Sequence, residues 1–257
     1  IIIGTHAVFQ EGVTYKDLSL VIYDEQHRFG VSQRLKLKEK AEDYPHQLLL
    51  SATPIPRTMA MGVLSGLDIS TIKSLPPNRT PIVTTTLPNN RRDALINRIK
   101  SAINKNSQVY WVCPLIDESE SELIGIEDLE KILKDEFVGD DYKILHGKMS
   151  DKEKGEILES FKNKETKILL ATTVIEVGID VPDANIIIIE NSERFGLAQL
   201  HQLRGRVGRG SKESYCILMH DDNLSELSQK RLKIICESND GFHIAEEDLK
   251  LRGPGDI

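Results

Sequence analysis

The sequence predicts an α/β protein built on parallel β-sheets. Short apolar runs alternate with longer charged stretches along most of the chain, which is the pattern of strands connected by helices. Several of these runs, such as Ile186–Ile189, are continuously apolar, as strands buried on both faces of a parallel sheet are. A proline-rich stretch at Leu75–Pro81 interrupts the pattern, because proline blocks helix continuation and strand pairing. We therefore expect two α/β units joined by a linker.

The first 78 residues contain few elements. Ser19–Tyr23 and Gln47–Leu50 are predicted to be buried parallel strands, and Gly30–Lys40 a helix, because its leucines lie on one side. Two strands are too few for a complete domain, so residues 1–78 are predicted to form a partial one. Its uncovered strands should expose apolar surface, which could lead two copies of the chain to form a dimer.

Residues 79–225 contain enough elements for a complete domain with five or six strands. The predicted strands are Gln108–Val112, Tyr142–Leu145, Lys167–Ala171, Ala184–Glu190 and Ser214–Met219. The predicted helices are Arg91–Lys105, Ile126–Phe137, Lys152–Lys162 and one near Leu197–Leu203. Residues 226–257 are predicted to begin a further helical motif.

Composition excludes several classes of protein. No apolar run approaches the roughly 18 residues of a membrane span, and no segment resembles a signal peptide, so no membrane partner is expected. The three cysteines are far apart and lack metal-site spacing, which is typical of reduced thiols in the cytoplasm. A net charge of −7 argues against a polycation that coats nucleic acid, but a local DNA groove remains compatible with it. Because the chain begins with Ile, we expect that its natural N-terminus lies upstream.

Two polar strings follow the predicted strands of the first unit. Asp24-Glu25-Gln26-His27 places adjacent carboxylates at a strand end, where one could hold Mg²⁺ through water and the other orient the attacking water in phosphoryl transfer. A polar turn that caps the next helix explains these four residues equally well. Ser51-Ala52-Thr53-Pro54 follows the second strand, and its hydroxyls could hydrogen-bond to the carboxylate loop, although such residues commonly form loops.

Two further strings lie in the second unit. Gln202–Arg209 contains three arginines separated by glycines, which could direct guanidinium groups into a cleft that binds polyphosphate; the alternative is a basic surface turn. Thr172–Asp180 follows a strand, and its threonines could bond to a DNA phosphate while Asp180 bonds to a ribose hydroxyl; an ordinary strand-to-helix turn is the alternative.

The order of these strings resembles the motif series of superfamily 2 helicases. Asp24–His27 resembles motif II, Ser51–Thr53 motif III, Thr172–Asp180 motif V and Gln202–Arg209 motif VI, while Gly4-Thr5-His6 is similar to the DNA-contacting motif just upstream. The resemblance implies RecA-like domains of the P-loop NTPase type with ATP and Mg²⁺ between them. It implies catalytic roles for Asp24 (also the metal ligand), Glu25, His27, Gln202, Arg206 and Arg209, nucleotide contacts by Ser51, Thr53, Gly178 and Asp180, and DNA contacts by Thr5, His146, Thr172 and Thr173.

Other strings are similar to the RecG family in particular. These are Asp24–Val31, Leu75–Arg79, Val112–Ile116 and the terminal stretch Gly241–Gly255, which resembles a helical hairpin that couples ATP turnover to movement on duplex DNA. Within it, Arg252 precedes Gly253-Pro254-Gly255, where a helix would end, and is a candidate coupling residue. A simple helix-terminal arginine is the alternative. The resemblance implies branched or forked DNA as the partner and the bacterial cytoplasm as the location, and it indicates no dedicated protein partner.

One departure concerns nucleotide binding. No Gly-x-x-x-x-Gly-Lys-Thr phosphate loop occurs in these residues, and in the family it lies upstream. We therefore expect ATP and Mg²⁺ to bind the longer parent protein, and neither to bind this chain alone. Three alternatives remain: the transcription-repair coupling factor, an RNA-unwinding member of the superfamily, and a nucleic-acid-binding fragment without catalysis.

Overall fold

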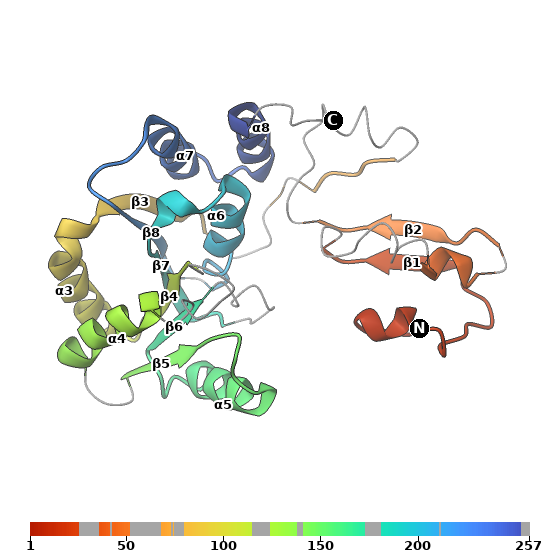
Figure 1. Cartoon of the computed structure of the whole chain (residues 1–257), viewed down its shortest axis with the longest axis horizontal. Coiled ribbons are helices and arrows are strands. Elements are labelled where there is room, and N and C mark those ends of the chain that lie inside the picture. Colours follow the sequence, from red (N-terminus) through yellow and green to blue (C-terminus); the bar gives the residue numbers. More distant parts are fainter. Residues whose placement is uncertain are drawn as a thin grey trace. The chain divides into compact units, whose positions relative to one another are not determined.

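The computed structural model describes most of the chain, and it divides into two units, Ile1–Pro54 and Ile55–Ile257 (Figure 1). The described residues are 1–25, 36–41, 43–51, 68–72, 74, 80–114, 124–137, 141–172, 181–210 and 212–252. The predicted boundary at residue 78 and most of the predicted helix Gly30–Lys40 lie outside these residues.

The first unit contains a two-stranded parallel sheet. Strand β1 (Leu20–Tyr23) pairs with β2 (His46–Leu49), so both predicted strands are confirmed to within one residue. Side chains alternate across the sheet: Val21 and Tyr23 are buried against Phe9 of the 3₁₀ helix η1 (His6–Phe9), whereas Ile22 is 55% exposed. The expected apolar surface is thus present, and it comprises Leu20, Ile22, Leu48 and Leu50.

The second unit is built on a six-stranded sheet in which every strand is parallel to its neighbours. The strands are β3 (Ile82–Pro88), β4 (Gln108–Cys113), β5 (Tyr142–Leu145), β6 (Ile168–Thr172), β7 (Ala184–Ile189) and β8 (Ser214–His220), in the spatial order β3-β8-β7-β4-β6-β5. The five predicted strands are confirmed. Strand β3 was not predicted, and it forms one edge of the sheet.

Helices cover both faces of this sheet (Figure 1). Helices α3 (Arg92–Ile103, preceded by η3, Asn89–Arg91) and α4 (Ile124–Glu136) pack on one face, which we call face A. Helices α5 (Asp151–Lys162), α6 (Leu197–Arg204), α7 (Glu226–Glu237) and α8 (Gly241–Arg252) contribute to the core on the other, face B. A short 3₁₀ helix, η7 (Ser192–Arg194), follows β7.

The central strand β4 shows why this segment is continuously apolar. Val109 and Trp111 point into the core of face A, and Tyr110 and Val112 into the core of face B, all with no exposed surface. Because all strands are parallel, their carboxyl ends share one edge of the sheet and their amino ends share the opposite edge. Among the described residues, no helix combines the length and apolar character that a membrane crossing requires.

Candidate functional site

Two predicted DNA-contacting residues are neighbours at the carboxyl edge of the second sheet. Leu145 of β5 is in register with Ala171 of β6, so His146 and Thr172 come next, side by side. Thr172 is fully buried, and its Oγ1 has no hydrogen-bond partner within the described residues; the buried Nδ1 of His146 also has none there. Buried polar atoms normally have partners, so both atoms keep hydrogen-bonding capacity that the described residues do not use.

The start of α5 lies directly after His146. Ser150 caps the helix, since its Oγ accepts a hydrogen bond from the Glu153 amide at 3.3 Å, while the Glu153 carboxylate accepts from the Ser150 amide at 2.9 Å. Hydrogen bonds from Ser150 lower the pKa of Glu153. This carboxylate already occupies part of the helix N-terminus, so His146 and Thr172, together with the exposed Lys148, are better placed to meet an anion.

The predicted arginine loop lies at the opposite, amino edge. Gly208 has a left-handed φ of +78°, and a Cβ there would approach Ile82, the first residue of β3, to 2.9 Å. A Cβ on Gly210 would come within 2.4 Å of the Pro182 carbonyl oxygen, just before β7. The glycines therefore let the loop pack closely on the sheet edge. Of the predicted residues here, Gln202 and Arg206 are half-buried and Arg209 is exposed.

Arg204 differs from the other two arginines, because only 2% of its surface is exposed. Its guanidinium donates to the carbonyl oxygens of Ile235 at 2.6 Å and Ser238 at 2.8 Å, at the end of α7, and to Nδ1 of His201 at 2.9 Å. Burial lowers its pKa. The expectation that all three arginines project into a cleft is thus wrong for Arg204, which joins α6 to the segment between α7 and α8.

The carboxylates of the predicted motif II follow β1 in the first unit. Leu50 donates its amide to the Tyr23 carbonyl at 2.8 Å, so the parallel register brings Asp24–Glu25 and Ser51 to the same edge. Asp24 Oδ1 accepts the Glu25 amide at 3.0 Å, and Glu25 adopts a left-handed φ of 52°, which is strained for a residue with a side chain. Thr5, which is exposed, begins η1 in the same unit.

This carboxylate pair supplies few of the ligands that the predicted Mg²⁺ needs. Within the described part of the chain, no group of three or more His, Cys, Asp or Glu residues gathers as a metal site. Asp24 and Glu25 therefore offer oxygen ligands for an ion that keeps most of its waters, as Mg²⁺ commonly does.

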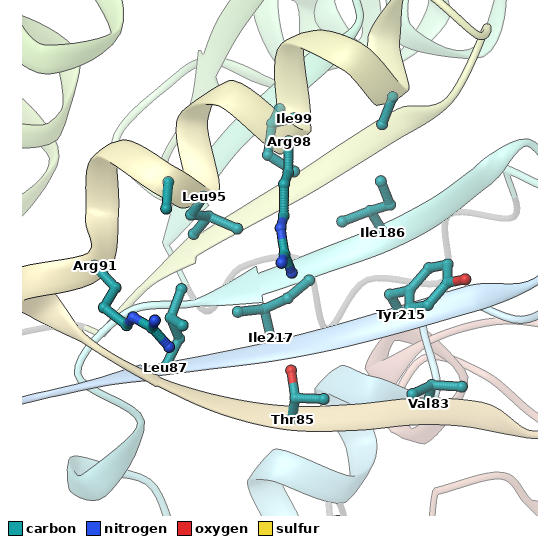
Figure 2. Close-up of a pocket in the computed structure, with 12 residues that line it drawn as sticks. Val83, Thr85, Leu87, Arg91, Leu95, Arg98, Ile99, Ile186, Tyr215 and Ile217 are labelled. Atoms are coloured by element: carbon teal, nitrogen blue, oxygen red, sulfur yellow. The ribbon is translucent and has the colours of Figure 1, made fainter.

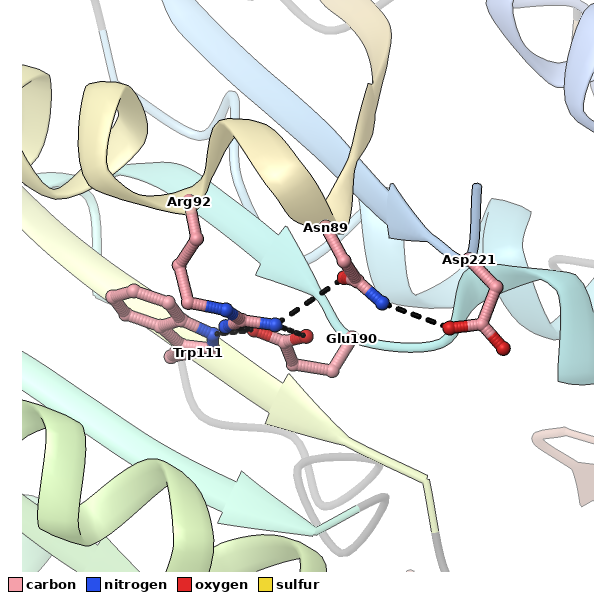
Figure 3. A network of polar contacts seen from close by, with 5 residues as sticks. All are labelled: Asn89, Arg92, Trp111, Glu190 and Asp221. Carbon is pink, nitrogen blue, oxygen red and sulfur yellow. Dashed lines mark hydrogen bonds and ion pairs between the residues drawn. The ribbon is translucent and has the colours of Figure 1, made fainter. Parts of the chain in front are cut away.

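A network that the sequence did not predict lies at the carboxyl edge of the second sheet (Figure 3). Glu190, 6% exposed, follows β7 and accepts from both terminal nitrogens of Arg92 and from Nε1 of Trp111 at 2.8 Å. Arg92 also donates to Asn89, which donates to Asp221 at 2.9 Å. Burial acts to lower the pKa of Arg92, but the hydrogen bonds and charge of Glu190 outweigh it and raise that pKa.

The network joins the ends of β3, β4, β7 and β8, the edge on which His146 and Thr172 also lie. A signal was present in the sequence: a glutamate directly after the apolar run Ile186–Ile189 must be buried and therefore needs a partner. Several predicted residues lie outside the described residues, namely His27, Thr53, Thr173, Gly178 and Asp180. Arg252 ends α8, but its side chain is also outside them.

Comparison with known proteins shows what the chain is similar to. Residues 90–211 match the helicase conserved C-terminal domain. The whole chain is similar to two proteins named ATP-dependent DNA helicase RecG, at 54% identity from Pasteurella multocida (strain Pm70) and 52% from Escherichia coli (strain K12). The chain spans only 38% of the length of each of these relatives.

Solved structures agree with this comparison. A RecG structure bound to a three-way DNA junction superimposes on 98% of this chain with a TM-score of 0.76 at 43% identity, and the match covers 32% of that protein. The L327V variant of S. cerevisiae Dbp5, bound to RNA and ADP BeF₃, matches 93% of this chain and 64% of its own with a TM-score of 0.61. At 15% identity, the Dbp5 match shows the fold alone.

Proposed function

We propose that the chain is the second half of the core of an ATP-dependent DNA helicase that remodels branched DNA, because residues 90–211 match the helicase conserved C-terminal domain. The observation that carries the proposal is the match over 98% of the chain to a RecG bound to a three-way junction. The parent protein, meaning the longer protein that contains this chain, would act in the cytoplasm in DNA repair and recombination.

In this proposal the first unit supplies the carboxylates of the ATP site. Asp24 would hold Mg²⁺ through water, and Glu25 would orient the attacking water and receive its proton; His27, Ser51 and Thr53 are the other residues assigned to this site. The strained backbone at Glu25 supports this role, because such strain concentrates at functional sites. When bound, Mg²⁺ neutralises charge on the phosphates.

The second unit supplies positive charge to the same reaction. Arg206 and Arg209 stabilise the charge that develops on the transferred phosphoryl group, assisted by Gln202, and Gly178 and Asp180 contact the nucleotide. The close packing of Gly208 and Gly210 supports this, because it holds the two arginines on a rigid edge. Arg204 is excluded from contact with ATP by its burial, and it serves instead to position α7 and α8.

DNA binds at the carboxyl edge in this proposal. His146 and Thr172 contact backbone phosphates with the atoms that have no partner among the described residues, and Thr173 and Thr5 are the further residues assigned to DNA contact. Arg252 couples nucleotide turnover to DNA movement at the end of α8. In the parent, the remainder of the first helicase domain covers the apolar face of β1 and β2; in the isolated chain, a second copy covers it.

The test compares the parent protein on a three-way junction and on a linear duplex of the same length. We expect ATP-dependent unwinding of the junction, ATPase that junction DNA stimulates more than linear duplex does, and loss of both with Glu25→Gln. The isolated chain should show no ATPase, since its residues contain no phosphate loop. Equal stimulation by linear and branched DNA would contradict the proposed substrate.

The coupling role needs its own variant. With Arg252→Ala, we expect ATPase on the junction to persist while unwinding is lost, because the residue transmits motion and does not touch ATP. Parallel loss of both rates, or no change in either, would reduce Arg252 to a helix-terminal residue.

A further inference from the structure

An apolar groove lies on face A of the second sheet, beside α3 (Figure 2). Its volume is about 460 Å³. The floor is formed by side chains of β3, β7 and β8, including Val83, Leu87, Ile186, Tyr215 and Ile217, and the wall by Leu95 and its neighbours on α3.

The groove exists because this corner of the sheet is incompletely covered. On face A, α3 and α4 pack over the middle of the sheet, and no described helix lies over β3 and β8, whereas on face B helix α7 contacts β3. Val83 is consequently 50% exposed and Tyr215 38% exposed, although both belong to a sheet strand. A contiguous apolar surface of this kind is typical of a binding site.

The charged side chains that line the groove are all positive. Arg91, the last residue of η3, and Arg98, in the middle of α3, extend over the floor, and Lys105 lies just beyond the end of α3. None of the three forms an ion pair within the described part of the chain, and no described carboxylate lines the groove. Glu213 lies near its rim, where it accepts the Tyr215 hydroxyl at 2.8 Å. Local cations on a chain of net charge −7 indicate an acidic occupant.

The spacing of the arginines indicates the shape of that occupant. Arg91 and Arg98 are seven residues apart, which is two helical turns or about 10 Å along α3. A second helix lying beside α3 would present carboxylates at the same spacing, and its apolar side chains at i, i+3, i+4 and i+7 would face the floor. We propose that this groove binds an amphipathic, acidic helix of a separate protein, with Arg91 and Arg98 pairing with two of its carboxylates.

The floor argues against nucleic acid and against an added strand. It is largely apolar, and Thr85 and Tyr215 are the lining residues that carry hydroxyl groups, so it offers a phosphate backbone few partners; it is also a face of the sheet, whereas an added strand needs a backbone edge. The groove also lies across the sheet from the core that contains Leu203 and Val207, so the arginine loop and the groove belong to different faces. Binding there is thus separable from the proposed ATP and DNA chemistry.

The test selects binders from a displayed library of 16-residue sequences, using the 257-residue chain as bait. We expect the enriched sequences to share the apolar helical spacing and acidic residues seven positions apart. Synthetic peptides are then titrated by fluorescence anisotropy against the chain and its variants. Arg91→Glu with Arg98→Glu should weaken binding about tenfold or more, and Val83→Lys should weaken it comparably, because each removes one half of the recognition.

A charge exchange and a matched control complete the design. A peptide whose two acidic residues are replaced by lysine should bind the Arg91→Glu, Arg98→Glu variant better than the unaltered chain. Lys152→Glu, which reverses an exposed cation on α5, should bind the original peptide normally. All substituted positions are exposed, and thermal unfolding of each variant verifies that it is folded.

Three results would overturn the proposal: no enrichment, enriched peptides that are basic, or binding that the groove variants do not affect. Titrating the same peptides against the parent protein tests whether the occupant belongs to a separate protein. If selected peptides bind the 257-residue chain and fail to bind the parent, a segment of the parent itself fills the groove. The parent with Arg91→Glu and Arg98→Glu should unwind the junction at an unchanged rate. Absence of peptide binding to the unaltered chain would therefore contradict the groove proposal alone, and loss of unwinding by the unaltered parent would contradict the helicase proposal alone.

Discussion

The carboxylate of Glu190 receives both terminal nitrogens of Arg92, at 2.5 and 2.9 Å, across 98 residues of sequence. The Arg92 side chain is 21% exposed and that of Glu190 8%, so this ion pair is largely shielded from water. Two-point pairing and the additional Trp111 donor satisfy the carboxylate well, which is the condition under which a buried pair is tolerated.

Removal of one partner of this pair should therefore destabilise the chain strongly. We expect Arg92→Ala to lower the free energy of unfolding by about 3–5 kcal/mol, because it leaves Glu190 buried and unpaired. Urea unfolding measures this. The exposed pair Lys100–Glu136 is the matched control, and Lys100→Ala should cost less than about 1 kcal/mol. Equal losses in the two variants would show that burial does not strengthen the requirement for pairing.

Thr172→Val tests the proposed phosphate contact. Its hydroxyl has no partner in the described residues, so valine should leave the unfolding free energy unchanged or slightly raised, while DNA affinity of the parent falls. Thr166→Val provides the opposite control: that buried hydroxyl bonds to Ser160 at 2.9 Å, so stability should fall by about 1–3 kcal/mol and DNA affinity should not. Unchanged DNA affinity in Thr172→Val would remove this residue from the track.

Arg206→Ala and Arg209→Ala in the parent should each lower ATP turnover by several orders of magnitude and leave DNA affinity almost unchanged. The reason is that their proposed target is charge that develops on the phosphoryl group. Steady-state ATPase and DNA titration over a range of salt concentrations measure the two effects, with Arg98→Ala as an exposed arginine that should alter neither. A variant that chiefly weakened DNA binding, with a shallower salt dependence, would reassign its arginine to phosphate contact.

Two glycine substitutions should have opposite signs. Gly208→Ala should destabilise the chain by about 1–2 kcal/mol or more, since φ is +78° and Ile82 lies 2.9 Å from the new Cβ. Gly155→Ala, within α5 and with nothing within 4 Å of the new Cβ, should stabilise it by about 0.5–1 kcal/mol. Chemical denaturation of both variants measures the difference, and the same sign for both would mean that the Gly208 turn can relax.

The thiol of Cys216 should be unreactive in the folded chain. Burial raises its pKa to about 12, from an ordinary value of 9.0, so almost no thiolate exists near pH 8. Above pH 9 only the unfolded state ionises this thiol, so the free energy of unfolding should decrease as pH rises. Mass spectrometry after iodoacetamide treatment should find Cys216 labelled only once the chain is unfolded. Rapid labelling of the native chain would contradict its burial.

Strands in the middle of the sheet could be predicted from the sequence, and the edge strand could not. Ala184–Ile189 is buried on both faces, and that burial imposes a continuous apolar run that is visible in the sequence. Among the described residues, strand β3 pairs with β8 alone, and one of its faces is uncovered. Polar side chains such as Thr84, Thr85 and Thr86 can therefore occupy it without being buried. Its pattern therefore resembles that of a loop.

The same physical limit applies to the site. The close spacing of Arg204, Arg206 and Arg209 suggests one role for all three, because a motif is defined by residues that are near one another in the sequence. Only the position of the Ile235 and Ser238 carbonyls, more than 30 residues later, buries Arg204 and separates it from the others. For the Arg92–Glu190 pair, the apolar run before Glu190 indicates a buried carboxylate, but the partner lies 98 residues away and no local pattern identifies it.

The arginine loop and the His146–Thr172 pair lie at opposite edges of the same sheet, and the rigid sheet between them makes the second unit a lever. Six residues, the length of β4, span about 20 Å at roughly 3.3 Å each. If the arginine end pivots on the phosphates of a nucleotide, a tilt of only about 10° carries the other end through about 3.4 Å, which is the spacing of successive phosphates along the axis of one DNA strand. In the proposed helicase, a small angular change at the nucleotide would thus be enough to advance this edge by one base pair.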